Sequence, residues 1–265
     1  MLKSIFVLVL FLTLSLAHGQ NTSDEVINDT QVWFDFNGKY NFDETRSISG
    51  FGGYRTTNPH YYDRILFVPT YNINHTKSPE FMNLKKPLIS SFHLGTGFYY
   101  TKNVDSDDNF EFRLMQGFKF FLPSFKHLPL KNYIRLEERF QKTFNGSSWN
   151  TAVRIRYKLS TVIEWNKHLF SFNQGMYLPM SIEVFFNLTE ADQFNDVIRI
   201  SPGVGYKFND QWKAEFFISY HYTLKTTADE NSSNDLVFRL RIYRANVKKA
   251  KILETKEEEI KELIE

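Results

Sequence analysis

Charged residues recur at every second position in several segments of this 265-residue sequence. In KNYIRLEERF (131–140), Arg135, Glu137 and Arg139 alternate with Ile134 and Leu136. Guanidinium groups can bind carboxylates through several planar hydrogen bonds, so this spacing could support an ionic network. Other charges in the same alternating pattern are Arg113, Arg154, Arg156, Glu183, Arg199, Glu215, Arg239 and Arg241.

Two uses of these charges remain open at this stage. Arg and Glu from neighbouring strands could form salt bridges that rigidify the inside of a small barrel, because enclosed charges need partners. Alternatively, the excess of Arg over Glu could line a pore or pocket that attracts anions. We favour the structural use.

Two pairs of Ser and His could do nucleophilic chemistry. Ser219 and His221 share a face with Glu215, and Ser91 and His93 share a face in another segment. A serine nucleophile needs a base within hydrogen-bond reach and a group that orients the base. The same alternation directs these side chains inward, whereas a lipid hydrolase needs access from the outer wall. We therefore assign no catalytic residue and keep an outer-membrane lipid hydrolase as an alternative.

The sequence predicts no cofactor and no metal site. It has no cysteine, its histidines are scattered, and it has no HExxH motif. The acidic segment 103–111 lacks the spacing and the glycine of an EF-hand loop.

The elements that must position these residues are predicted to be long strands. Aromatic residues make up 17% of the sequence, yet the mean hydropathy is −0.39, and the apolar and polar residues interleave with a period of two. The runs exceed the ~5–6 residues usual in soluble proteins and match the ~9–11 of a tilted membrane strand. They span 31–42, 45–56, 62–73, 88–102, 109–122, 130–143, 150–165, 168–187, 196–208, 211–224 and 234–245.

This pattern predicts an antiparallel transmembrane β-barrel. Bacterial barrels close with an even number of strands, so we expect about 12 strands, with 10 as the alternative. Short turns at 43–44, 166–167 and 209–210 alternate with longer loops at 103–108, 144–149, 188–195 and 225–233. Such alternation is typical of outer-membrane proteins, whose periplasmic turns are short.

In a membrane, contact with lipid determines which residues can face the outside of the barrel. A charge facing lipid costs ~2–4 kcal/mol at the bilayer midplane, so the charged faces should line the lumen. Trp33, Trp149, Trp165 and Trp212 all lie near predicted strand ends. We expect these four to form an interfacial aromatic girdle.

The two ends of the chain differ from the alternating region. Residues 1–19 have Lys3, an apolar run and small residues before Gln20, which predicts a secretory signal peptide. Residues 20–245 are then the barrel. Residues 246–265 are rich in Lys and Glu, with apolar residues at helical spacing, and predict a short amphipathic helix that could bind a periplasmic partner.

Export without cysteine is ordinary for a bacterial envelope protein. The formal net charge of +2 argues against nucleic acid as a partner. The expected partners are outer-membrane lipid, lipopolysaccharide and the barrel-assembly machinery.

Several segments also resemble a known family. RLEERF (135–140), RIRYKL (154–159), EVFFN (183–187), RISPGVGYKFNDQW (199–212), FRLRIY (238–243) and QVWFDFNGKYNF (31–42) are similar to DUF2490. The resemblance implies an outer-membrane β-barrel, found largely in Bacteroidota, without an established activity. No site residue can therefore be carried over. Unlike such barrels, which normally end on an aromatic closing strand, this chain continues for some 20 residues after FRLRIY.

We therefore expect a bacterial outer-membrane barrel with an Arg/Glu-lined lumen, acting as a narrow pore, a transport barrel or a structural barrel. The alternatives are the hydrolase and a soluble exported β protein that binds an apolar ligand. In the soluble protein, the apolar faces would point inward.

Overall fold

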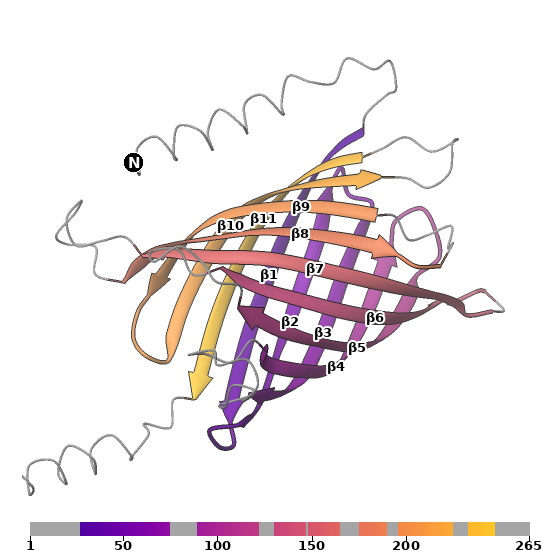
Figure 1. Cartoon of the computed structure of the whole chain (residues 1–265). Coiled ribbons are helices and arrows are strands. Elements are labelled where there is room, and N and C mark those ends of the chain that lie inside the picture. The colour runs from indigo at the N-terminus through magenta and orange to yellow at the C-terminus, as the bar shows by residue number, and fades with distance from the viewer. Residues whose placement is uncertain are drawn as a thin grey trace, which may run out of the picture.

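The computed structural model describes residues 27–74, 89–121, 130–146, 148–164, 175–189, 196–224 and 233–246, which form one closed β-barrel (Figure 1). The all-β barrel prediction is confirmed. The strands are β1 (Ile27–Asn41), β2 (Arg46–Asn58), β3 (Tyr62–Asn74), β4 (Ile89–Asn103), β5 (Asn109–Phe121), β6 (Lys131–Thr143), β7 (Asn150–Glu164), β8 (Met176–Asn187), β9 (Asp196–Lys207), β10 (Trp212–Leu224) and β11 (Ser233–Asn246).

Sequence alternation explains how each strand divides its side chains between two faces. In β4, Ser91, His93 and Tyr99 are buried inside the barrel, while Phe92 and Leu94 are exposed on its outer wall. Successive residues of a strand point to opposite faces, so the register of the barrel sends every second residue inward.

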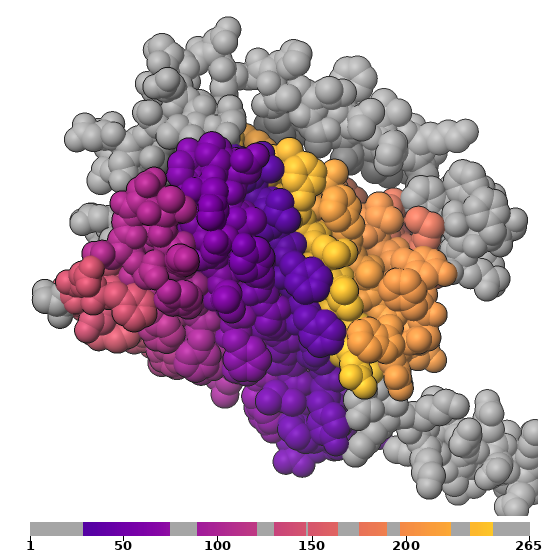
Figure 2. Space-filling view, turned by 180° about the vertical axis from the view of Figure 1, so that it is seen from behind, coloured from indigo at the N-terminus to yellow at the C-terminus, as the bar shows by residue number. Residues whose placement is uncertain are grey.

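The number of strands differs from the prediction. The barrel closes with eleven, because β1 pairs in parallel with β11, from Ile27 opposite Ser233 to Tyr40 opposite Asn246. All other neighbours pair antiparallel. The expected even number assumed that the closing pair would also be antiparallel. A parallel pair forms a regular ladder too, so an odd barrel can close without an open edge. Figure 2 shows this seam, with β1 in indigo beside β11 in yellow.

The parallel seam places the two ends of the barrel chain at opposite rims. The strand ends that flank segments 42–45, 75–88, 122–130, 165–175 and 208–211 lie at the rim where β11 ends, which we call the first rim. The strand ends that flank segments 59–61, 104–108, 144–149, 188–195 and 225–232 lie at the second rim, where β1 begins. The predicted short turns 43–44 and 209–210 lie at the first rim and the predicted longer loop 103–108 at the second rim, while the long segment 75–88 also connects strand ends at the first rim.

The two faces of the barrel wall have opposite chemical character. Large apolar side chains are exposed along the outer face, including Val32, Ile65, Phe67, Leu94 and Ile218. Rings stack side by side on this face, as between Phe98 and Phe112, whose centroids are 5.3 Å apart. The inner face is largely polar or charged, with one small apolar cluster of Leu66, Val68, Tyr99 and Met115.

Three predictions lie outside the described residues: the signal peptide at 1–19, the helical tail after Asn246, and Trp165. Within the described residues, no helix is long and apolar enough to cross a membrane.

Candidate functional site

The ionic residues predicted from the sequence all lie on the inner face of the barrel. Each belongs to a strand whose intervening residues face outward, so the same alternation that builds the wall collects the charges inside it. All of them except Glu215 join into three groups, which we call the Glu137 cluster, the Glu183 cluster and the Asp35 cluster after the carboxylate at the centre of each.

The Glu137 cluster spans β5, β6 and β7. The Glu137 side chain has no exposed surface and accepts hydrogen bonds from Arg135 and Arg154, with a distance of 2.7 Å from Arg135 Nε. Arg113 reaches the same carboxylate at 3.7 Å. Glu111 extends the cluster, because its two oxygens accept from Arg113 at 2.7 and 2.9 Å and one also accepts from Arg139 at 2.5 Å.

The Glu183 cluster lies on β7, β8 and β9. Arg156 pairs with Glu183 at 2.5 Å, Lys158 at 2.7 Å and Arg199 at 3.3 Å. Only 2% of Glu183 is exposed, so this enclosed carboxylate is paired with three cationic side chains inside the barrel.

The Asp35 cluster lies at the β1–β11 seam. Asp35 is fully buried and accepts a hydrogen bond from Arg239, while Arg241 lies 3.6 Å away. These contacts join the first strand to the last, so the seam is held by charge as well as by its backbone ladder.

Glu215 on β10 has different partners. Lys213 donates to it at 2.8 Å, and the hydroxyls of Tyr177 and Tyr243 donate at 2.8 and 2.6 Å. Its carboxylate is therefore satisfied mainly by neutral hydroxyls and one lysine, unlike the Arg-rich clusters.

Asp35 is the main member that the sequence argument missed. It alternates with Val32, Phe34 and Phe36 in the first strand, so the signal was present in the same period-two pattern. The sequence argument also missed Arg55, whose guanidinium carbon lies 3.9 Å from the centre of the Trp33 ring.

Trp33 corrects the predicted aromatic girdle. It lies on the inner face with Gln31 and Asp35 and is only 4% exposed, so it cannot be part of a girdle on the outer wall. Arg199 and Arg239 lie 5.0 and 5.1 Å from its ring, a distance that permits cation–π attraction. Its nearness to the strand end suggested the girdle, but its parity along the strand places it inside.

The remaining described tryptophans lie near opposite rims. Trp149, just before β7, is half exposed, and Lys142 lies 6.0 Å from its ring. Trp212 begins β10 on the outer-wall parity and packs against Phe36, with ring centroids 6.2 Å apart.

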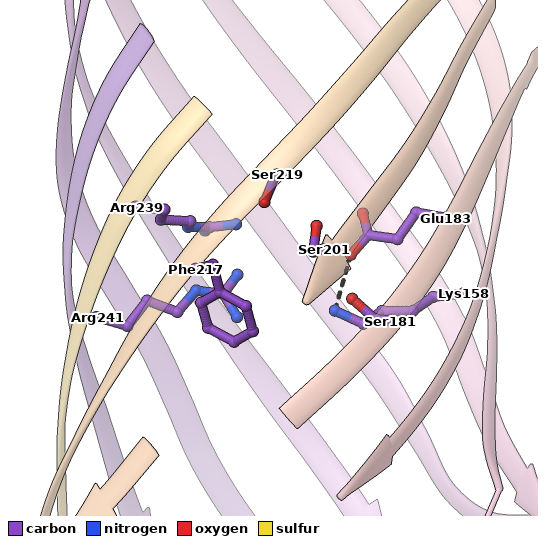
Figure 3. Close-up of a pocket in the computed structure, with 8 residues that line it drawn as sticks. All are labelled: Lys158, Ser181, Glu183, Ser201, Phe217, Ser219, Arg239 and Arg241. Atoms are coloured by element: carbon purple, nitrogen blue, oxygen red, sulfur yellow. Dashed lines mark ion pairs between the residues drawn. The ribbon is translucent and has the colours of Figure 1, made fainter. Parts of the chain in front are cut away.

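A small cavity lies between two of these clusters. A cavity of about 10 Å³, the room of about one water molecule, lies between the Glu183 and Asp35 clusters. Figure 3 shows Lys158 paired with Glu183 on one side, Arg239 and Arg241 on the other, and the Phe217 ring beside Arg241. Phe217 interrupts the polar residues on the inner face of β10 and fills part of the lumen, with 5% of its surface exposed.

The Ser219–His221 pair does not form a catalytic arrangement. Both side chains are buried, but His221 Nε2 has no hydrogen-bond partner, and its ring packs edge-on against Trp33 at 5.2 Å. Glu215, the expected orienting acid, is bound instead to Lys213, Tyr177 and Tyr243.

One comparison identifies the family. The family model described as a protein of unknown function, DUF2490, matches residues 30–232, which is most of the barrel. The chain belongs to the DUF2490 family. No curated protein and no solved structure matches this DUF2490 chain. The matched range includes Asp35 and the Glu137 and Glu183 clusters, whereas the Asp35 partners Arg239 and Arg241 lie just beyond its end.

Proposed function

We propose that this DUF2490 protein is an outer-membrane β-barrel with a closed, salt-bridged interior, and that its role is structural rather than that of an open pore. The observation that carries the proposal is the inverted polarity of its wall. Apolar side chains are exposed outside, while carboxylates such as Glu137 and Asp35 are fully enclosed.

The outer wall supports a lipid environment. Soluble monomers rarely expose apolar patches larger than a few hundred Å². Here the exposed apolar residues occur on strand after strand around the barrel, including Phe34, Ile65, Leu94, Phe186 and Ile218. Acyl chains would cover such a surface without the cost of hydrating it.

One carboxylate departs from this pattern. Glu138 lies on the outer-wall parity of β6, next to Glu137 in sequence, and lines a groove with Leu94, Leu114 and Gln116. The groove partly shelters its side chain, which reduces the area that would meet lipid.

The interior supports a closed rather than an open barrel. The ion pairs join side chains from β5 to β9 and across the β1–β11 seam. A conducting pore needs a continuous water-filled path, whereas Glu137, Glu183 and Asp35 are enclosed by their partners inside the barrel. Each central carboxylate of the network pairs with more than one cationic side chain. If part of the network opened, the lumen would therefore carry an excess of positive charge, which would attract anions.

The soluble alternative required the apolar faces to point inward around a ligand. The described residues have the opposite arrangement, so this alternative has no observation in its favour. Lipopolysaccharide, the assembly machinery and a periplasmic partner for the tail remain proposed partners.

The experiment compares two equally exposed phenylalanines. Phe67 is 58% exposed in the middle of β3, and Phe208 is 61% exposed in the 208–211 turn. We expect Phe67→Lys to weaken barrel stability in vesicles by ~2–4 kcal/mol, because its ammonium group would face acyl chains. Phe208→Lys is the matched control and should have little effect, because the turn faces water.

The measurements are flotation with lipid vesicles, and urea unfolding followed by the mobility of unheated samples on gels. The wild-type chain should float and migrate as a compact species until it is heated. A wild-type chain that stays soluble and monomeric without detergent, or equal stability of the two variants, would refute the membrane location. Planar-bilayer recordings should show no steady conductance, and a steady open channel would refute the closed interior.

A further inference from the structure

We propose that Ser91, His93 and Asn72 form a hydrolytic site for acyl esters that carry an anionic group. The three side chains lie on the inner face of β3 and β4, close to the first rim. Ser91 Oγ is 2.7 Å from His93 Nε2, and His93 Nδ1 is 2.6 Å from Asn72 Oδ1. The sequence had placed Ser91 and His93 on one face but offered no third member, because Asn72 comes from the neighbouring strand.

The hydrogen bonds around Asn72 determine which atoms donate and which accept between Asn72, His93 and Ser91. Its amide nitrogen donates to Ser49 Oγ at 2.9 Å and also lies within reach of Ser47 Oγ and the backbone oxygen of Thr70. The amide oxygen is therefore left to accept from His93 Nδ1–H. That bond leaves the lone pair of Nε2 directed at Ser91, so His93 is arranged as a base for the Ser91 hydroxyl.

The contrast with the second Ser–His pair strengthens this assignment. Ser219 and His221 have the same spacing on an inner strand face, yet no hydrogen bond joins them and His221 Nε2 has no partner. Spacing alone does not create the Ser91–His93 bond. The bond depends on a third group that orients the imidazole.

The backbone beside the nucleophile is irregular. The pairing of β4 with β5 shifts between Ile89 and Ser91, so Ser90 is left out of the register. Such bulges occur often beside active sites, where they redirect a side chain. Gly117 lies opposite His93, where a side chain would meet the backbone of β6 and the ring of Tyr133. The Tyr133 ring packs edge-on against the imidazole, with ring centroids 5.3 Å apart.

Cations at this rim define the class of substrate. Lys119 lies opposite Ser91 in the register. Lys39, Lys119 and Lys131 are exposed, and none forms an ion pair within the described part of the chain. An ester with a carboxylate or phosphate group would satisfy these ammonium groups.

The reaction that this arrangement supports has two steps. In the first, Ser91 Oγ bonds to the carbonyl carbon as its proton moves to His93 Nε2, and the alcohol leaves with that proton. In the second, water gives a proton to His93 and its oxygen bonds to the acyl carbon. The Ser91–acyl bond then breaks, the carboxylic acid leaves, and Ser91 recovers its proton. Asn72 acts as a positioning residue, because its amide oxygen accepts from His93 and contacts neither Ser91 nor the reacting ester.

The first experiment uses the full mature chain folded in detergent and a fluorophosphonate probe. Ser91 Oγ would bond to phosphorus as fluoride leaves and the proton passes to His93. We expect labelling of the wild type, none of Ser91→Ala, and at least a ~100-fold slower reaction for His93→Asn. Ser219→Ala and His221→Asn are matched controls that should label like the wild type. Gel mobility before heating verifies that every variant is folded.

Labelling that persists in folded Ser91→Ala, or no labelling of folded wild type, would overturn the proposal. Because this experiment is done in detergent, its outcome is independent of the membrane location proposed above.

The second experiment defines the substrate. We expect faster hydrolysis of 4-nitrophenyl hemisuccinate than of 4-nitrophenyl butyrate, and loss of that preference in Lys119→Gln. Release of fatty acid from vesicles that contain phosphatidylglycerol would assign the anionic ester to lipid, and cleavage of the soluble ester alone would assign it to a small molecule. Equal rates on the charged and neutral esters would refute the anionic class.

Asn72 has its own test within this experiment. Asn72→Ala should lower kcat and alter its pH profile, while Asn72→Asp, which retains an acceptor for Nδ1–H, should restore much of the rate. Equal activity of Asn72→Ala and wild type would refute the positioning role.

Discussion

Replacing Glu137 by glutamine tests whether the enclosed ionic network stabilises the barrel. The substitution preserves the shape of the side chain but removes its negative charge. Arg135 and Arg154 would lose a direct partner, and Arg113, whose guanidinium lies 3.7 Å from the carboxylate, would lose a neighbouring charge. Because Glu137 has no exposed surface, water cannot replace it.

The expected loss follows from the cost of stranding buried charges. Removing one partner of a buried ion pair typically costs ~3–5 kcal/mol. A urea dependence of ~1–3 kcal/mol per molar then lowers the unfolding midpoint by at least about 1 M. Glu138→Gln is the matched control, because it makes the same change at the next residue on the opposite face. The urea unfolding midpoint of Glu138→Gln should not fall, because no ion pair of Glu138 is found among the described residues.

The assay is urea unfolding of the detergent-folded barrel, followed by tryptophan fluorescence and gel mobility. A second arm replaces Glu137, Arg135 and Arg154 together by methionine. If the loss comes from stranded charge, this triple variant should recover much of the stability, because apolar side chains of similar volume often replace buried ion pairs without loss. An unchanged midpoint in Glu137→Gln, or an equal fall in Glu138→Gln, would refute the reasoning.

Two further predictions concern a close packing contact and a turn. In Gly205→Ala the new methyl group would clash with the Tyr177 ring, so we expect a loss of ~1–3 kcal/mol in urea unfolding. Gly38→Ala, where nothing lies within 4 Å, should lose markedly less, and equal losses would contradict the packing argument. In the exposed turn after β1, hydrogen bonds from Thr45 and then Arg46 hold the pKa of Asp43 well below its usual ~3.9. Its contribution to stability is therefore present at neutral pH and is lost as pH falls below ~4, so Asp43→Asn should flatten the acid side of the stability curve, and an unaltered curve would count against it.

Local alternation made the strands predictable. Most predicted runs agree with the observed strands to within a few residues, because the residues that face inward and outward differ so clearly in polarity. The largest deviation is the run 168–187, of which only Met176–Asn187 is a strand in the described residues. Alternation also predicted that the charges of the ionic clusters share one face, although it did not indicate which residues pair.

Pairing between distant strands was not predictable in the same way. The parallel β1–β11 seam depends on which two edges meet, and neither edge carries a signal for direction in its own residues. The parity of Trp33 along its strand indicates an inward side chain, whereas its nearness to a strand end favoured the outer girdle. Asn72 shows the same limit, because its proximity to His93 comes from the β3–β4 register.

The sequence by itself determined that this chain forms long strands with an apolar face and a charged face, because side-chain direction in a strand repeats every two residues. Only the tertiary structure decided that eleven strands close through a parallel seam, which carboxylate each arginine contacts, and that Asn72 orients His93 toward Ser91. Those outcomes depend on the register between strands far apart in the chain, and register is fixed only when the whole barrel closes.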